Sequence, residues 1–397
     1  MQRLTCGAIA TGLRIAYIGN QLKKPMDARL LASPLLRRLV QITGLILLLG
    51  GCTSHEHQAY NPNQQPYTMP ASFAEGYYDY RAETPQPEYY SLPFQQIPGY
   101  HLSGLRFPSS EDNGQPDNMV DARYFRSNRS GPKPLLIVLP IWATHTFPSM
   151  VISNGYTQHS EGQVNVLWLQ GDGALFDWFE LAEIDNQETF DREVALAASR
   201  FRAVAIDTRR LIDCAQAQPE IDSSRIAIIG FSMSALVGAN VAGNDPRINT
   251  AVYVLGGARP WDMMAECNLV VQYMREQVSA DLGWDQEQYR AFFREHLAPG
   301  DPALWRGRYR PENTLIIESS KDDCIPPESR EALFYATGQP ERIVYPYNHW
   351  QPFLSMTPVG RNVLTRDIFE FLDRKLLQPQ QNTYLGSHQL TSSGESR

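Results

Sequence analysis

The segment RIAIIGFSMSALVGANVAG, residues 225–243, changes character in its middle. Up to Gly230 it is an almost continuous run of β-branched and other apolar residues, which predicts a buried strand. Ser232 follows two positions later, and the small and apolar residues after it suit a helix. A serine between a strand and a helix either caps the helix or acts as a nucleophile. The rest of the chain must distinguish these two roles.

Predicted strands and helices alternate along most of the chain. Two short strands with a polar turn between them come first, at 101–110 and 119–128. Further strands are predicted at 134–140, 164–170, 225–230, 250–257, 314–320 and 342–347, and helices at 188–214, from 232, around 328–338 and over 364–372. This alternation predicts an α/β fold in which helices flank a mostly parallel sheet on both faces. Residues 260–313, rich in Trp, Met, Tyr and Phe, are expected to form a helical insertion over the strand ends.

Serine catalysis requires more than a serine. An ordinary hydroxyl is a poor nucleophile, so it needs a histidine base, a carboxylate that orients the base, and amide donors for the oxyanion. Asp322 and Asp323 come after one later strand, and His349 comes after the next. The ends of parallel strands meet at one edge of a sheet, so these side chains can lie near Ser232. His349 alone could equally be a packed core histidine, and Asp323 is the alternative acid.

The arrangement of strand, GFSMS and helix resembles the nucleophile elbow of the α/β-hydrolase superfamily, in the style of its dienelactone-hydrolase and acyl-peptidase-like branches. The family pattern is G-x-S-x-G, and this chain has Ser234 in place of the last glycine. In LIIESSKDDCIPP, Asp322 precedes Pro326 by four residues, as the family's acid does. The resemblance therefore implies that Ser232, Asp322 and His349 are the catalytic residues, in the chain order of the superfamily.

The resemblance also implies an oxyanion hole. Its donors would be the backbone N–H of Met233 and that of either Ile141 or Trp142, in the segment LPIWATH. The chain lacks the His-Gly pair that is common there, and Trp142 could equally be a pocket wall or a core aromatic residue. No paired carboxylates or histidine cluster with metal-ligand spacing occur in the sequence, so no cofactor is implied.

The N-terminal region has the layout of an export signal. Arg37 and Arg38 precede LVQITGLILLLGGC, an apolar run too short to cross a bilayer comfortably. LGGC resembles a bacterial lipobox, which implies that Cys52 becomes the lipidated first residue; the alternative is a buried or anchoring helix with an incidental cysteine. We expect residues 1–51 to be a signal peptide, and Met26 is an alternative start that gives a leader of ordinary length.

Composition divides the remainder into three parts. Residues 52–96 are rich in Tyr, Pro, Gln and Glu and are expected to be a flexible tether, although their aromatic residues leave room for part of it to pack on the domain. Residues 97–377 are expected to form the α/β-hydrolase domain, with a lid insertion at about 260–313. Residues 378–397 are polar and are expected to be disordered.

The charge of the chain argues against one class of partner, and its cysteines limit the possible disulfides. The net charge of -8 and the sequence pI of about 5.6 argue against a nucleic-acid partner, because phosphate binding needs a dense Lys and Arg surface. After export the domain would hold Cys214, Cys267 and Cys324, which leaves at least one cysteine unpaired. Whether Cys267 and Cys324 form a disulfide stays open at this point.

These observations predict a membrane-tethered serine hydrolase that cleaves a carboxylic ester or a related acyl bond through an acyl-enzyme on Ser232. The expected partners are a small-molecule acyl substrate and the membrane itself, through the lipid on Cys52. A peptidase or acyltransferase would use the same residues, and a non-catalytic envelope lipoprotein is the remaining alternative. Thr53 is not an aspartate, which by resemblance to enterobacterial sorting favours the outer membrane, facing the periplasm or the surface.

Overall fold

The computed structural model divides by its contacts into two units, Met1–Ser54 and His55–Arg397. Cys52 and Trp142 lie outside the described residues, as do the expected signal peptide and nearly all of the C-terminal tail. No helix within the described residues is long and apolar enough to cross a membrane. The structure describes residues 55–64, 76–81, 85–92, 97–115, 117–141, 146–171, 175, 177–358 and 360–378.

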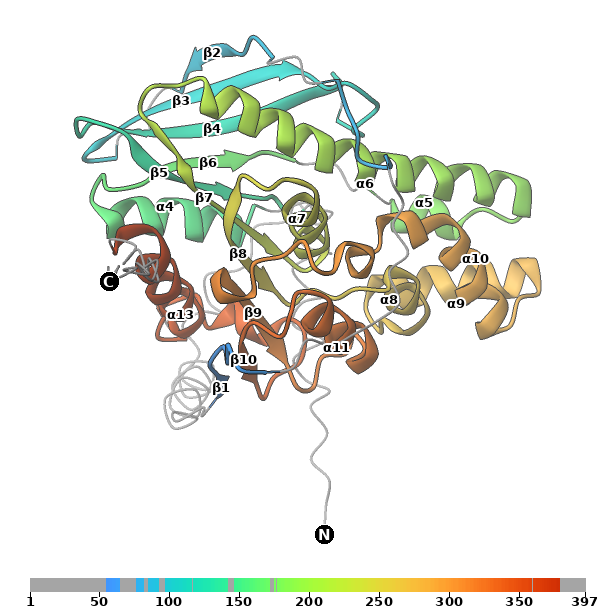
Figure 1. The fold of residues 1–397 in the computed structure, drawn as a ribbon. Coiled ribbons are helices and arrows are strands. Elements are labelled where there is room, and N and C mark those ends of the chain that lie inside the picture. The colour runs from blue at the N-terminus through green and yellow to red at the C-terminus, as the bar shows by residue number, and fades with distance from the viewer. Residues whose placement is uncertain are drawn as a thin grey trace, which may run out of the picture. The chain divides into compact units, whose positions relative to one another are not determined.

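The second unit is built on one ten-stranded sheet with the order β1-β10-β9-β8-β7-β5-β6-β4-β3-β2 (Figure 1). The strands from β5 to β10 are parallel to one another, and β1, β2, β3 and β4 pair antiparallel with their neighbours. The strands are β1 (Glu56–Gln58), β2 (Glu88–Ser91), β3 (Tyr100–Pro108), β4 (Met119–Ser127), β5 (Lys133–Val138), β6 (Asn165–Leu169), β7 (Ile221–Phe231), β8 (Ile248–Val254), β9 (Thr314–Ser319) and β10 (Glu341–Tyr345).

Helices cover both faces of this sheet, which confirms the predicted α/β class with a mostly parallel sheet. Side chains alternate along β7, so that Ile228 packs with one set of helices and Ile229 with another. The first set includes α6 and α7, and the second includes α4 and α13. The helices are α4 (Ser149–Ser160), α5 (Trp178–Ala182), α6 (Gln187–Gln216), α7 (Met233–Asn244), α8 (Pro260–Glu266), α9 (Val270–Leu282), α10 (Gln286–Leu297), α11 (Pro327–Ala336), α12 (Gln351–Leu354) and α13 (Val363–Leu372).

The segments that leave the carboxyl ends of the parallel strands carry the predicted site residues. Ser232 follows β7, Asp322 follows β9 and His349 follows β10. Helices α8, α9 and α10 lie in the chain between β8 and β9, where the aromatic content predicted an insertion. They form a separate apolar cluster with α5 and the first half of α6. The insertion therefore has a core of its own beside the sheet.

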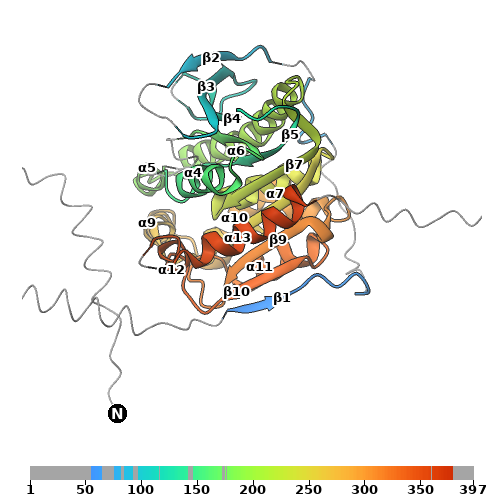
Figure 2. The ribbon, with the colours of Figure 1, turned by 90° about the vertical axis from the view of Figure 1, so that its left-hand side faces the viewer.

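Two features depart from the expectations. Parts of the expected tether join the sheet, since β1 pairs with β10 at one edge and β2 with β3 at the other (Figure 2). Such short segments carry no periodicity that a sequence pattern could reveal. Helix α4 was not predicted, because polar residues lie on its buried side: Ser153 and Thr157 are fully buried, and the Thr157 hydroxyl donates to the Ser153 carbonyl at 3.0 Å.

Candidate active site

Ser232 lies on a sharp turn between β7 and α7. Its φ of 52° and ψ of -117° are unusual for a residue with a side chain, and such strain is common at functional sites. The turn is held by a bond from the Ser232 N–H to the Val254 carbonyl at 2.8 Å. Gly230 is required here, because a Cβ at this position would lie 2.1 Å from the Ser234 carbonyl oxygen. The chain thus meets the steric demand of a nucleophile elbow at its first glycine.

Ser234, which replaces the last glycine of the family pattern, is fully buried and closes the turn. Its hydroxyl oxygen accepts from the Phe231 N–H at 2.7 Å and lies 3.0 Å from the Phe231 carbonyl, to which it can donate. The extra side chain therefore satisfies both backbone groups of Phe231.

The structure brings Ser232, His349 and Asp322 into one hydrogen-bonded row. The Ser232 Oγ lies 2.9 Å from His349 Nε2, and His349 Nδ1 lies 3.0 Å from each carboxylate oxygen of Asp322. His349 is 1% exposed. A proton on Nδ1 that faces the carboxylate leaves Nε2 as an acceptor for the serine proton. The imidazole therefore has a fixed orientation, and its unprotonated Nε2 faces the serine hydroxyl.

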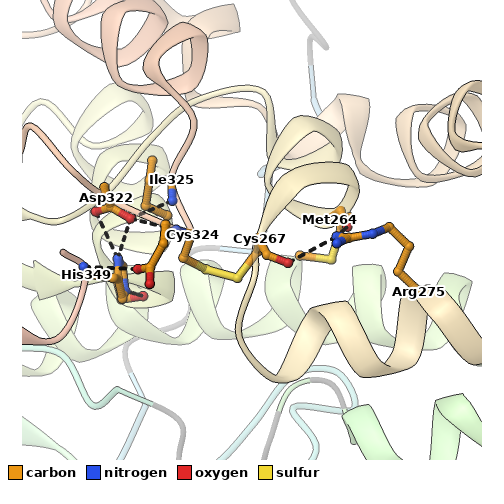
Figure 3. The surroundings of a disulfide bond; sticks show 9 residues. Met264, Cys267, Arg275, Asp322, Cys324, Ile325 and His349 are labelled. Carbon is orange, nitrogen blue, oxygen red and sulfur yellow. Dashed lines mark hydrogen bonds and ion pairs between the residues drawn. A yellow bond between two sulfur atoms is a disulfide. The ribbon is translucent and has the colours of Figure 1, made fainter. Parts of the chain in front are cut away.

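Backbone amides hold the acid in place (Figure 3). Asp322 Oδ1 accepts from the N–H of Cys324 at 2.9 Å and from that of Ile325 at 2.8 Å. Asp323 points elsewhere: its Oδ1 accepts from the backbone N–H of His349 at 3.2 Å, and its carbonyl accepts from the Asn268 N–H at 2.8 Å. Asp322 thus faces the imidazole, while Asp323 fixes the histidine backbone.

A disulfide connects the insertion to the loop that carries the acid. Cys267, directly after α8, is bonded to Cys324, two residues after Asp322 (Figure 3). The Arg275 guanidinium steadies the α8 side by donating to the Cys267 carbonyl at 3.1 Å. Cys214 is a free, buried thiol among the described residues, and burial raises its pKa to about 12. The pairing left open by the sequence is therefore Cys267 with Cys324.

The oxyanion donors are only partly described. Met233 is the first residue of α7, and the first amides of a helix have no acceptor within it, which suits the binding of negative charge. Ile141 is buried, with 6% of its surface exposed, and it ends a described segment. Trp142, the other predicted donor, lies outside the described residues.

Ser232 opens into a cavity with mostly apolar walls. Its walls come from α6, α7 and the insertion, and they include Cys267 and Cys324 of the disulfide. Tyr77 and Tyr78, from the expected tether, also line it, and no sequence signal linked them to the site. His296 also lines the cavity, and its Nε2 lies 3.1 Å from Asp191. The apolar lining includes Trp178, Phe201, Leu236, Met263, Met264, Val271 and Ile325.

A metal centre has no support in the part of the chain that the structure describes, where no group of three or more His, Cys, Asp or Glu residues could hold an ion.

Comparison with known proteins bears on the fold and the family. Residues 143–271, which include Ser232, match the family model described as Phospholipase/Carboxylesterase. Acetyl xylan esterase 1 from Thermoanaerobacterium sp. JW/SL YS485 is 18% identical with a TM-score of 0.51, covering 72% of this chain and 88% of that one. Acetyl xylan esterase from Paenibacillus sp. R4 is 15% identical with a TM-score of 0.51, covering 85% and 94%.

A comparison with curated protein sequences found no match. At identities of 18% and 15% the two solved structures bear on the fold alone. That fold agrees with the family match over the elbow and with the parallel sheet described above. The chain has the α/β-hydrolase fold.

Proposed function

We propose that this protein is a serine hydrolase that cleaves a carboxylic ester or a related acyl bond. The observation that carries the proposal is the row of hydrogen bonds from the Ser232 hydroxyl through His349 to Asp322. Burial of the histidine and acid favours it further, since a shielded, pre-oriented base is what nucleophilic serine requires.

The reaction follows from this geometry in two steps. His349 Nε2 accepts the proton of Ser232 as Oγ attacks the acyl carbon, and the proton then passes to the leaving group as the acyl-enzyme forms. A water molecule, deprotonated by the same nitrogen, attacks the acyl-enzyme and releases the acid and the free serine. The Met233 amide at the start of α7 would bind the oxyanion. The imidazole must be neutral at the start, so turnover should fall at acidic pH.

The cavity walls suggest what the substrate carries next to the scissile bond. The wall residues are almost all apolar, as is typical of small-molecule sites. An apolar acyl or aromatic group fits such walls better than a charged one. Helices α8 and α9 supply Met263, Met264 and Val271, so the insertion would act as the lid over this group.

Anchoring in the cell envelope is a separate part of the proposal. It rests on LGGC after an Arg-flanked apolar run, with Cys52 as the lipidated residue and the outer membrane as the destination. Anchoring would depend on acyl chains that transfer favourably into lipid. Replacing Cys52 with Ser should therefore move the protein out of the membrane fraction, and retention of this variant after a high-salt wash would contradict the proposal.

The activity is tested with a fluorophosphonate probe and chromogenic esters of graded acyl length. Only an activated serine reacts with the probe, so Ser232→Ala should lose labelling and several orders of magnitude in turnover. Ser199→Ala removes an exposed hydroxyl on α6 and is the matched control. Labelling that persists in Ser232→Ala would refute the nucleophile. Comparing an ester with the amide of the same acid would distinguish an esterase from a peptidase.

A further inference from the structure

Exposed apolar side chains gather at the carboxyl ends of the parallel strands. Of the seven large apolar side chains that are exposed within the described residues, six follow the carboxyl ends of parallel strands. The seventh, Tyr89, lies on β2 at the far antiparallel edge. Exposed apolar side chains that cluster, rather than scatter, indicate an interaction site. We call these six the apolar rim: Met150, Phe179, Val270, Tyr273, Trp350 and Leu354.

Phe179, Val270 and Trp350 of the apolar rim lie next to residues of the Ser232 site. Phe179 and Val270 are the chain neighbours of Trp178 and Val271, which line the cavity. The rings of Phe179 and Tyr273 are 6.1 Å apart, so α5 and α9 present one joint surface. On the other side Trp350 packs edge-on against the imidazole of His349 at 5.5 Å. The elements that carry the rim, α4, α5, α9 and α12, lie on the left-hand side in Figure 2.

The first described residue, His55, also lies at the carboxyl ends of the parallel strands. Because β1 runs antiparallel to β10, with Glu56 opposite Val344, the residue before β1 lies beside the carboxyl end of β10. His55 is accordingly 5.0 Å from the ring of Tyr345, the last residue of β10. Only two residues separate His55 from Cys52. An extended chain covers about 3.5 Å per residue, so the connection from Cys52 to His55 spans about 10 Å at most.

We propose that the apolar rim contacts the surface of a lipid bilayer and that the cavity opens toward it. The proposal rests on the proposed function for the role of the cavity and on Cys52 for the anchor. A lipid on Cys52 would hold the carboxyl edge at the membrane as long as β1 stays paired with β10. Tryptophan and tyrosine side chains favour the interfacial region of a bilayer. The full sequence carries a net charge of -8 and residues 1–51, which processing at Cys52 would remove, are basic, so the anchored protein favours a zwitterionic over an anionic lipid surface.

The contact with lipid is tested directly by fluorescence quenching. The lipidated protein is reconstituted in phosphatidylcholine vesicles with and without brominated acyl chains, and Trp350→Phe isolates the emission of Trp350 by difference. We expect brominated lipid to quench the Trp350 emission. We expect little quenching of the residual emission from buried tryptophans such as Trp168 and Trp305. Protein that floats with the vesicles while the Trp350 emission stays unquenched would overturn the proposal.

Kinetics give the second test. The double substitution Phe179→Ser and Leu354→Ser removes two rim side chains that are 53% and 64% exposed and do not line the cavity. We expect its rate on an ester dispersed in phosphatidylcholine vesicles to fall about tenfold, with the rate on a dissolved ester unchanged. Tyr89→Ser, 45% exposed at the far edge, is the matched control and should keep both rates.

The outcomes separate this proposal from its rivals. An unchanged vesicle rate in the double variant, or an equal loss in Tyr89→Ser, would overturn the lipid contact. A change in sedimentation from dimer to monomer with an unchanged vesicle rate would assign the apolar rim to a second copy of the chain, and would also overturn it. If the fluorophosphonate probe fails to label Ser232, the proposed function fails, and the quenching of Trp350 still decides the lipid contact on its own.

Discussion

Restoring the family glycine at position 234 should destabilise this protein, although the resemblance alone suggests that Ser234→Gly is tolerated. The Ser234 hydroxyl accepts the Phe231 N–H at 2.7 Å in a fully buried turn. Without it, that N–H would have to find another acceptor or remain unsatisfied away from water. The strand and helix are already in place around Gly230, so a second glycine would relieve no contact that the structure shows.

The size of the effect follows from two contributions. A buried donor that loses its acceptor costs about 1–3 kcal/mol. Glycine in place of serine in the first turn of α7 adds roughly 0.5 kcal/mol of helix propensity. We therefore expect Ser234→Gly to lower the free energy of unfolding by about 1.5–3.5 kcal/mol. Ser234→Ala should lower it by nearly as much, because it loses the same hydrogen bond.

Urea unfolding measures this difference, provided that the slope of free energy against urea stays the same in each variant. Ser199→Ala is the control, because its hydroxyl donates to the Leu196 carbonyl on an exposed helix face and should change stability by less than about 0.5 kcal/mol. A Ser234→Gly protein as stable as the wild type would refute the reasoning. It would show that the Phe231 N–H finds another hydrogen-bond acceptor when the Ser234 hydroxyl is absent.

Three further predictions concern the acid loop and its neighbours. Asp322→Asn should lower ester turnover by up to about 10⁴-fold by favouring the wrong tautomer of His349, whereas Asp323→Asn keeps an oxygen acceptor for the His349 N–H and should cost little; a larger loss in Asp323→Asn would reverse the assignment. Cys267→Ala with Cys324→Ala opens a link across 57 residues and should lower the free energy of unfolding by about 4 kcal/mol in the chain-entropy model, and dithiothreitol should then weaken the wild type but not the variant. Burial raises the pKa of Glu318 above 4.5 even though Arg342 lowers it, so the stability linked to this carboxyl is present below pH 4.5 and lost as pH rises through the folded pKa. Between pH 4 and 8 the free energy of unfolding of Glu318→Gln should therefore rise relative to that of the wild type. Parallel plots of unfolding free energy against pH for the two proteins would contradict this.

The predictable part of the structure is the part that local pattern and chain order control. Apolar runs such as the one ending at Gly230 identified the central strands, and parallel topology then required Ser232, Asp322 and His349 to leave the sheet at one edge. Adjacent aspartates on an extended segment point in different directions, so only one was expected to reach His349, and the family spacing to Pro326 favoured Asp322.

The remainder depends on contacts between distant segments. Tyr77 and Tyr78 reach the cavity from a region whose composition resembles a tether, and Tyr78 packs against Trp305 with ring centroids 5.7 Å apart. No periodicity records such a contact. The role of Ser234 was hidden for a related reason, since its partner is a backbone group whose free N–H becomes visible only when the turn is built.

The bond between Cys267 and Cys324 makes the timing of oxidation part of how the site is assembled. Disulfides form and persist outside the cytosol, where thiols are kept reduced. A chain that folds before export would hold the insertion against the acid loop by noncovalent contacts alone, among them the bond from Asn268 to the Asp323 carbonyl. Exported chains would gain the covalent closure afterwards. In the proposed exported protein, the wall of the cavity and the loop of Asp322 would then be locked together only after the chain has left the cytosol.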